Sequence, residues 1–361
     1  MASFEESVPG SPVNPPLLDD AAIPSPPPSL AYRDRSGGLL AFGIVQIIAG
    51  GLLSLGIPLI LLGALLSRKA GGGMPMGGYL LSMTSYGLGA VVLITLGVGS
   101  IRARRWAHAL TLILSWAWLF MGIMVTVFLT AVLPAAFVTA FHKAGAVDPN
   151  AGAMPTGVLA VILTLIIVVC SIFLVVLPLA FLLFYRKRDV EETVRHKDPV
   201  ERWTDRCPLP VLAASLLLAW ACPYYLIMSF TTPLIPFFGK YLTGVPGAIG
   251  CLLIAGLYAY LAHSLFRMRL AGWWIAATVL TLRTASAVVT YARGDLLQAY
   301  ARMGWKDAQL QMMTESPIFR SHLILWWSVG FLLVFLGYML WIKRYFGLPR
   351  APAGSASPSA I

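Results

Sequence analysis

The sequence predicts an all-α polytopic membrane protein with about eight transmembrane helices, arranged as a parallel tandem repeat of a four-helix unit. The first observation is the shortage of charge: 58% of the 361 residues are hydrophobic and only 11% are charged, against roughly 25% charged in soluble domains. The second is the length of the apolar runs, which reach the roughly 20 residues that cross the hydrocarbon as a helix. The third is a similarity between the two halves.

Both ends of the chain differ from this apolar interior. Residues 1–38 contain eight prolines and no apolar signal-peptide core, and residues 347–361 have a similar Pro, Ala and Ser composition. Neither segment can bury enough apolar surface to offset the entropy of ordering. We therefore expect two disordered tails and a membrane domain between them.

The apolar runs divide this domain into two units of four spans each. The first unit covers 39–188, a cytoplasmic linker covers 189–208, and the second unit covers 209–346. Pro134 and Pro178 are expected to kink the long third and fourth spans, and segment 231–246 is open to interpretation as a loop or a re-entrant turn. The expected spans are Leu39–Leu66, Tyr79–Gly99, Trp106–Phe141, Gly157–Tyr185, Leu209–Phe230, Gly244–Leu265, Ala271–Tyr291 and His322–Phe346.

The distribution of Lys and Arg predicts the orientation. With the N-terminus inside, 17 of the 26 cationic residues fall on the cytoplasmic side, in agreement with the positive-inside rule. We therefore expect both termini in the cytoplasm, and the net charge of +11 needs no nucleic-acid partner to explain it. The cytoplasmic cations are Arg33, Arg35, Arg102, Arg104, Arg105, Arg186, Lys187, Arg188, Arg195, Lys197, Arg202, Arg206, Arg267, Arg269, Lys343, Arg344 and Arg350.

Short motifs recur in the same order in both halves. The turns after the second and sixth spans each carry an R-x-R pair followed by a tryptophan, Trp106 or Trp273. Four spans in each half make the repeat parallel rather than inverted. The outer loops share the pattern aromatic-x-cation-x-G-x-x-D, formed by Phe141, Lys143, Gly145 and Asp148 in the first half and by Tyr300, Arg302, Gly304 and Asp307 in the second.

The sequence contains no recognisable catalytic or metal-binding motif. Phosphate-binding loops, dinucleotide fingerprints and zinc-protease or esterase signatures are absent. All fifteen acidic residues fall in tails or loops, so an intramembrane carboxylate that could carry protons or cations is missing. The four cysteines have no C-x-x-C spacing. We expect no catalytic residues, no metal and no cofactor.

Arg283 is the one charge expected inside the hydrocarbon. Ser286 and Thr290 follow it at i+3 and i+7, on the same helical face. Because an uncompensated arginine at this depth costs several kcal/mol on insertion scales, this stripe should face the protein interior. Two interpretations remain open: a site for an anionic group or lipid, or a structural arginine bonded to carbonyl and hydroxyl groups.

The linker between the units is expected to extend the fourth helix into the cytoplasm. Glu191–Arg195 and Glu192–His196 are favourable i,i+4 pairs, Pro199 should end this helix, and Asp205 is expected to cap the next span. The stretch from Asp198 to Leu212 contains D-P-x-x-R-W-T-D-R-C-P-L-P. It resembles a loop of uncharacterised bacterial multi-pass membrane proteins, which implies location in a bacterial inner membrane and no particular activity.

These observations favour a non-enzymatic scaffold or accessory subunit of a membrane complex, in contact with phospholipid and with other membrane proteins. The hypothesis rests on the absence of catalytic motifs and ion-carrying carboxylates. The alternative is a transporter or channel for an anionic or amphipathic solute, with Arg283 in the binding site at the interface of the halves.

Overall fold

The computed structural model confirms the all-α class, and the residues it describes include eight helices long and apolar enough to span a membrane. It describes residues 33–69, 76–147, 156–305 and 323–347, together with 307, 310, 311 and 314. Asp34–Ile361 forms one compact unit. The spanning segments are α1 (Ser36–Lys69), α2 (Met76–Ile101), α3 (Arg105–Val147), α4 (Thr156–Ser171) continued by α5 (Leu177–Tyr185), α7 (Leu209–Thr231), α8 (Gly244–Phe266), α9 (Leu270–Arg293) and α13 (Leu323–Lys343), which ends in the 3-10 turn η3 (Arg344–Gly347).

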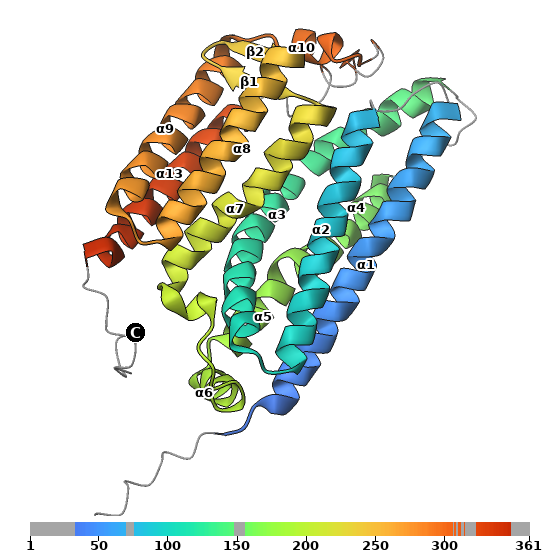
Figure 1. The fold of residues 1–361 in the computed structure, drawn as a ribbon. Helices are drawn as coiled ribbons and strands as arrows, with labels where there is room; N and C mark the ends of the chain where they lie inside the picture. Colours follow the sequence, from blue (N-terminus) through green and yellow to red (C-terminus); the bar gives the residue numbers. More distant parts are fainter. Residues whose placement is uncertain are drawn as a thin grey trace, which may run out of the picture. The chain divides into compact units, whose positions relative to one another are not determined.

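The helices pair in the same way on both sides of the unit. Helix α1 packs along α2, and α7 packs along α8; α3 packs along α4 and α5, and α9 packs along α13. Helix α2 also contacts α7, so the two groups of four meet there. Figure 1 shows that α1 begins, and α13 ends, at the same end of the unit.

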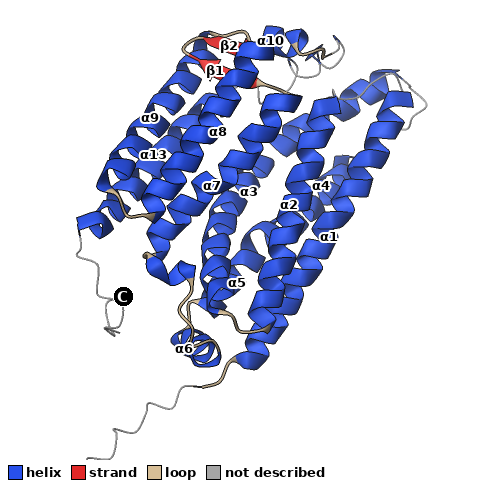
Figure 2. Cartoon of the chain, in the orientation of Figure 1, coloured by secondary structure: helices blue, strands red, loops and turns tan. Residues whose placement is uncertain are grey.

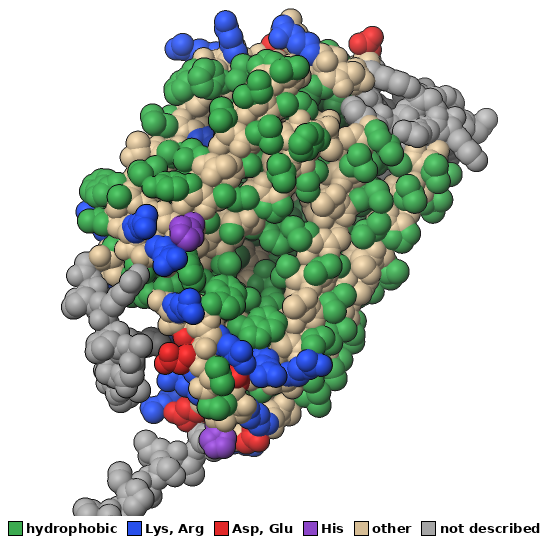
Figure 3. Space-filling view, viewed as in Figure 1, with side chains coloured by type: hydrophobic (Ala, Val, Ile, Leu, Met, Phe, Trp, Pro, Cys, Tyr) green, Lys and Arg blue, Asp and Glu red, His purple; other side chains and the backbone are tan. Residues whose placement is uncertain are grey.

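The molecular surface carries its charge at the two ends. Figure 3 shows apolar side chains over the middle of the visible face and charged side chains gathered at both ends. Many large apolar side chains are exposed along the spans, for example Leu59 at 66% and Leu253 at 69%. This pattern is the one a lipid-facing surface requires, because apolar side chains lose nothing by facing hydrocarbon.

Pro178 distorts the fourth span in the way a proline is expected to. The π-helical turn η1 (Ile172–Val176) separates α4 from α5. Pro178 has no N–H, so the carbonyl oxygen of Leu174 loses its donor at i+4. That carbonyl faces Gly122 of α3, where a Cβ atom would collide with the oxygen. A glycine is therefore needed at this crossing.

The linker folds against the bundle instead of extending the fourth helix. Helix α5 ends at Tyr185, Lys187 is extended, and the separate helix α6 (Arg188–Lys197) buries Val190, Thr193 and Val194. The prediction of a continuous helix was therefore wrong, because an amphipathic segment gains more by covering the end of the bundle than by projecting into water. The Glu191–Arg195 ion pair is present at 2.6 Å.

Two aspartates fix the linker to the turn between α2 and α3. Asp198, only 2% exposed, accepts from Arg202 at 3.0 Å and from the backbone N–H of Arg105 at 3.3 Å, and it lies 3.7 Å from Arg104. The hydrogen bond from Arg202 is the main cause that lowers the pKa of Asp198. Asp205 does not cap α7; it accepts from the N–H of Arg202 and pairs with Arg105 inside the 3-10 turn η2 (Trp203–Arg206).

Segment 231–246 contains a β-hairpin that the sequence did not predict. Strands β1 (Leu234–Phe237) and β2 (Lys240–Thr243) pair antiparallel, with Phe237 opposite Lys240. The two residues between them, Phe238 and Gly239, have φ of 39° and 94°. Two positive φ angles are the signature of the type I′ turn that suits a two-residue hairpin. Figure 2 shows these strands, in red, at the end of the unit opposite to α6.

The two R-x-R turns have matching backbone conformations. Ala103 and Met268, the middle residues, have φ of 49° and 55°. In each turn the middle N–H donates three residues back, at 2.8 Å, and the second arginine N–H donates five residues back, which is a Schellman motif. The tryptophans are out of register, since Trp106 follows Ala103 by three residues and Trp273 follows Met268 by five. The residue of the first half that corresponds to Trp273, five positions after Ala103, is His108.

The outer-loop motifs lie in different backbone settings. Phe141, Lys143 and Gly145 lie within α3, and Asp148 lies outside the described residues. In the second half, Tyr300 and Arg302 belong to the short helix α10 (Leu296–Arg302), which is capped by Asp295 through the N–H of Gln298. Gly304, at φ 86°, lies in the turn that follows α10, and Asp307 is exposed.

Candidate binding cavity

Arg283 projects from α9 toward two tyrosines on neighbouring helices. Its guanidinium donates hydrogen bonds to the hydroxyl of Tyr258 on α8, at 2.6 Å, and to the hydroxyl of Tyr225 on α7. It also lies 4.9 Å from the ring centre of Tyr225 and 5.7 Å from that of Tyr258. Among the described residues, no carboxylate pairs with Arg283. Within the described part of the chain, the arginine therefore has polar neighbours and no compensating charge.

The expected inward orientation of Ser286 and Thr290 is confirmed, but their hydroxyls bond to the β-hairpin instead of facing a ligand. Ser286 is 4% exposed and Thr290 is fully buried. Ser286 Oγ accepts from the N–H of Phe238 at 2.9 Å and donates to the carbonyl of Pro236, while Thr290 Oγ1 accepts from the N–H of Gly239 at 3.0 Å. Both hydroxyls hold the hairpin turn against α9.

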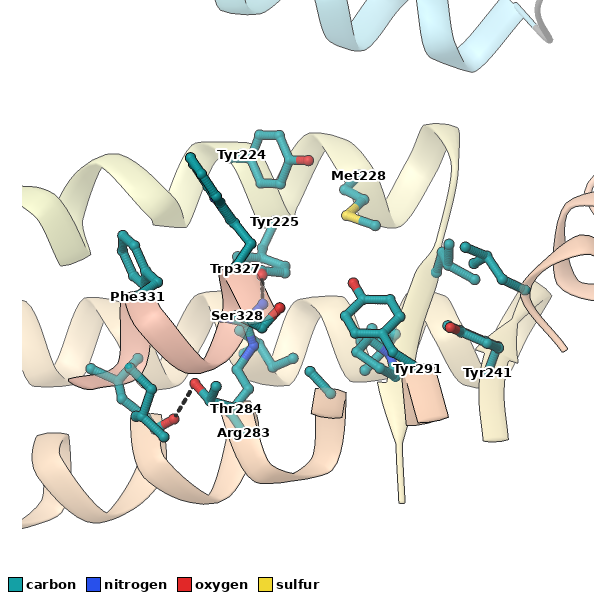
Figure 4. Close-up of a pocket in the computed structure, with 18 of the residues that line it drawn as sticks. Tyr224, Tyr225, Met228, Tyr241, Arg283, Thr284, Tyr291, Trp327, Ser328 and Phe331 are labelled. Carbon is teal, nitrogen blue, oxygen red and sulfur yellow. Dashed lines mark hydrogen bonds between the residues drawn. The ribbon is translucent and has the colours of Figure 1, made fainter. Parts of the chain in front are cut away.

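A cavity of about 490 Å³ lies beside Arg283. Its lining residues come from α7, α8, α9, α10, α13 and the hairpin, so it lies within the second group of four helices and not at the interface of the halves. Figure 4 shows Arg283 and Thr284 on one side, Tyr224 and Tyr225 on the opposite side, and Trp327, Ser328 and Phe331 in between. Ser286 and Thr290 do not line it.

The wall of the cavity changes in character along the axes of the surrounding helices. Leu280, Ile254 and Phe335, by their positions along α9, α8 and α13, line the deeper part, which is farther from the hairpin. Tyr291, Tyr241 and Tyr300 line the part nearer the hairpin. Burial raises the pKa of Tyr241 and of Tyr300, so both hydroxyls remain protonated and able to donate. The Tyr241 hydroxyl is buried and makes no hydrogen bond with any described residue.

The residues of the outer-loop motif contribute little to this cavity. Tyr300 lines it, whereas Arg302 is exposed and donates to Gln298 at 2.8 Å. The sequence did not lead us to predict Tyr225 and Tyr258 as partners of Arg283. One signal could have found them: a tyrosine within an apolar span has a hydroxyl that needs a polar partner, and Tyr225 and Tyr258 both lie in such spans.

The residues that the structure describes include no cluster of three or more His, Cys, Asp or Glu that could hold a metal ion. Comparisons of the chain with protein-family models, with curated proteins and with solved structures gave no match.

Proposed function

We propose that this chain is a membrane transporter whose second four-helix unit binds a small organic anion at Arg283. The proposal rests on one observation: a guanidinium on the wall of a cavity has hydroxyl and ring partners but no described carboxylate. Tyrosine hydroxyls stabilise the arginine without neutralising it. An oxyanion in the cavity would supply the missing charge, through the strong charge-assisted bonds that arginine forms with carboxylates and phosphates.

The depth of the arginine favours transport over surface binding. Arg283 lies ten residues before the end of α9 at Arg293, which is about 15 Å along the helix. That distance is about half of the 30 Å hydrocarbon thickness. Substrate sites of secondary transporters lie near the bilayer midplane.

Anion-dependent stabilisation of the purified protein tests this function. A ligand that binds only the folded state raises the unfolding temperature. Naphthoate, undecanoate and phosphatidylglycerol would be compared with naphthylmethylammonium and undecylammonium. We expect at least one anion, and neither cation, to raise the unfolding temperature. Reconstituted vesicles should then take up the stabilising anion.

Variants connect this effect to the cavity. Arg283→Leu should abolish the stabilisation, and Arg283→Lys should weaken it because lysine lacks the planar fork. Arg293→Leu, on the same helix but exposed, is the matched control and should respond like the wild type. Retained stabilisation in a folded Arg283→Leu protein, or no response to any anion, would refute the function. The latter outcome is the one that a scaffold or accessory subunit predicts.

We further propose that the chain consists of two copies of a four-helix unit. The matching Schellman turns and the identical helix pairing support this relation. In addition, Nε2 of His108 bonds to the carbonyl of Tyr185, and Nε1 of Trp273 donates to the carbonyl of Met339. In each half, the residue five positions after the middle residue of the R-x-R turn thus bonds, through a ring nitrogen, to a backbone carbonyl of the fourth span. The outer-loop motifs, which lie in different backbone settings, count against this relation.

The orientation and the membrane remain part of the proposal. In the topology that the sequence predicts, 17 of the 26 cationic residues fall on the side of the linker helix α6, which supports a cytoplasmic location for that side. The resemblance of the linker motif supports a bacterial inner membrane as the site of this transporter.

A further inference from the structure

We propose that the ligand of this cavity is a compact organic monoanion with a flat aromatic body, which enters from the hairpin end. The inference rests on the proposed function and specifies the chemical class of its substrate and the side of entry. The oxyanion would bind Arg283, and the aromatic body would lie among the rings of the cavity wall.

The charge of the ligand follows from the charge of the wall. Among the described residues that line the cavity, Arg283 alone is ionised at neutral pH. A dianion would bring a second charge into an environment of apolar side chains and neutral tyrosines, where an unpaired charge is costly to bury. A single negative charge matches the site.

The aromatic body follows from the composition of the wall. Six of the rings that line the cavity belong to Tyr224, Tyr225, Tyr291, Tyr300, Trp327 and Phe331. They come from α7, α9, α10 and α13, so they surround the cavity from several directions. Aromatic pairs contribute binding free energy beyond the burial of their area when rings stack or meet edge to face. A flat ring can use these contacts, and a flexible alkyl chain cannot.

The size and depth of the cavity distinguish a free solute from a membrane lipid. A volume of about 490 Å³ lies within the range of sites for drug-sized ligands. A phospholipid headgroup lies at the membrane surface, about 15 Å above Arg283. A lipid that carries the same oxyanion would therefore have to move its headgroup into the hydrocarbon to bind Arg283. A compact solute can instead place both its oxyanion and its apolar part inside the cavity.

The side of entry follows from where the polar groups lie. The deeper wall at Leu280, Ile254 and Phe335 is apolar, whereas tyrosines line the wall near the hairpin and α10. Among the described residues, the buried hydroxyl of Tyr241 has no hydrogen-bond partner, and Figure 4 shows that its side chain lies near Tyr291, on the same side of the cavity. A polar substituent of the ligand would satisfy this hydroxyl. An anion meets donors along this route and would meet none at the deeper end.

Binding of matched probes to the full-length protein tests the class of ligand. Dissociation constants would be measured for naphthoate, for undecanoate, for naphthalenedicarboxylate and for phosphatidylglycerol in nanodiscs. We expect naphthoate to bind about tenfold more tightly than undecanoate, and the dianion and the lipid to bind more weakly than naphthoate. Equal or tighter binding of undecanoate, the dianion or the lipid would overturn this inference while leaving anion binding at Arg283 intact. Binding of no anion would instead refute the proposed function.

Protection from labelling tests the side of entry. In sealed vesicles, a Tyr300→Cys variant should react with a membrane-impermeant maleimide added on the hairpin side, and naphthoate should slow this reaction severalfold. Asp307→Cys, which is exposed and outside the cavity, is the matched control and should label at the same rate with and without naphthoate. Labelling of Tyr300→Cys that naphthoate does not change, while naphthoate still binds, would exclude this route.

Discussion

Ala103 and Met268 adopt the left-handed backbone region at the corresponding point of the two R-x-R turns. Residues with a Cβ atom are strained there by roughly 1–2 kcal/mol, yet neither position is a glycine. In both turns this conformation lets two backbone N–H groups reach the free carbonyls of the preceding helix. The strain is thus compensated locally, by the same pair of hydrogen bonds in each half.

Substitution of these two residues by glycine tests whether the turns are equivalent. Ala103→Gly should raise the free energy of unfolding by up to about 1 kcal/mol, since relief of the strain exceeds the added entropy of the unfolded chain. Met268→Gly should do the same relative to Met268→Ala, the reference that removes the packing of the Met268 side chain against the buried cluster. Thermal unfolding in detergent measures both changes. Ala109→Gly, in regular α3, should instead lower stability. Opposite responses of the two turns would count against a duplicated unit.

At the scale of elements, two close contacts connect neighbouring segments of the fold. The first is the crossing of α3 with the distorted fourth span, where Gly122 faces the carbonyl of Leu174. The second is the attachment of the hairpin to α9 through the hydroxyls of Ser286 and Thr290. Each contact joins segments distant in sequence, and each needs a particular small side chain.

Gly122→Ala should destabilise the protein by about 1–3 kcal/mol, because the new methyl group collides with backbone that cannot move away as a side chain would. The unfolding temperature would be compared with that of Gly51→Ala, a matched control in α1 where a Cβ atom meets nothing within 4 Å. The control should be neutral or slightly stabilised. Equal effects of the two substitutions would mean that α3 and the fourth span are less close than described.

Removal of the two hydroxyls should loosen the hairpin without unfolding the bundle. In a Ser286→Ala, Thr290→Val double variant, the N–H groups of Phe238 and Gly239 lose their acceptors, at about 1–3 kcal/mol for each unsatisfied group. Hydrogen exchange should accelerate across Leu234–Thr243 and remain slow in α8. A Thr284→Val variant, whose hydroxyl bonds within its own helix, is the control. Unchanged exchange in the hairpin would exclude this anchoring role.

At the scale of the whole molecule, Asp198 connects the linker with the turn between α2 and α3. Its carboxylate is almost fully buried and meets Arg202, Arg104 and the backbone of Arg105. Asp198→Asn should lower the free energy of unfolding by about 1–3 kcal/mol at neutral pH. Glu192→Gln, which removes an exposed i,i+4 pair with Arg188, should have little effect.

The pH dependence of this difference has a defined sign. Because the folded protein lowers the pKa of Asp198 below 3.8, its stabilisation is complete above pH 3.8 and is lost as the pH falls through the lowered value. The free energies of unfolding of the wild type and of Asp198→Asn should therefore differ by a constant amount near neutral pH and converge only in acid. Convergence near neutral pH would show that another group supplies the effect.

The topology is the other prediction at this scale. Reporter fusions after Arg188 and after Lys306 should report opposite compartments, with Arg188 in the cytoplasm, because the cations are concentrated on that side. A fusion after Arg344 should agree with the one after Arg188. Reporters after Arg188 and Lys306 in one compartment would exclude eight spans with both ends inside.

The sequence by itself determined the number and approximate limits of the spans and the inward orientation of Arg283, Ser286 and Thr290. Both follow from local features of the chain. A run of about 20 apolar residues crosses the hydrocarbon as a helix, and an isolated cation at that depth must face the protein interior. Only the tertiary structure decided that Tyr225 and Tyr258 hold the arginine, that Ser286 and Thr290 anchor a hairpin, and that α6 folds back on the bundle. These contacts join residues on different segments, and their partners depend on how the helices cross, which no local pattern in the chain records.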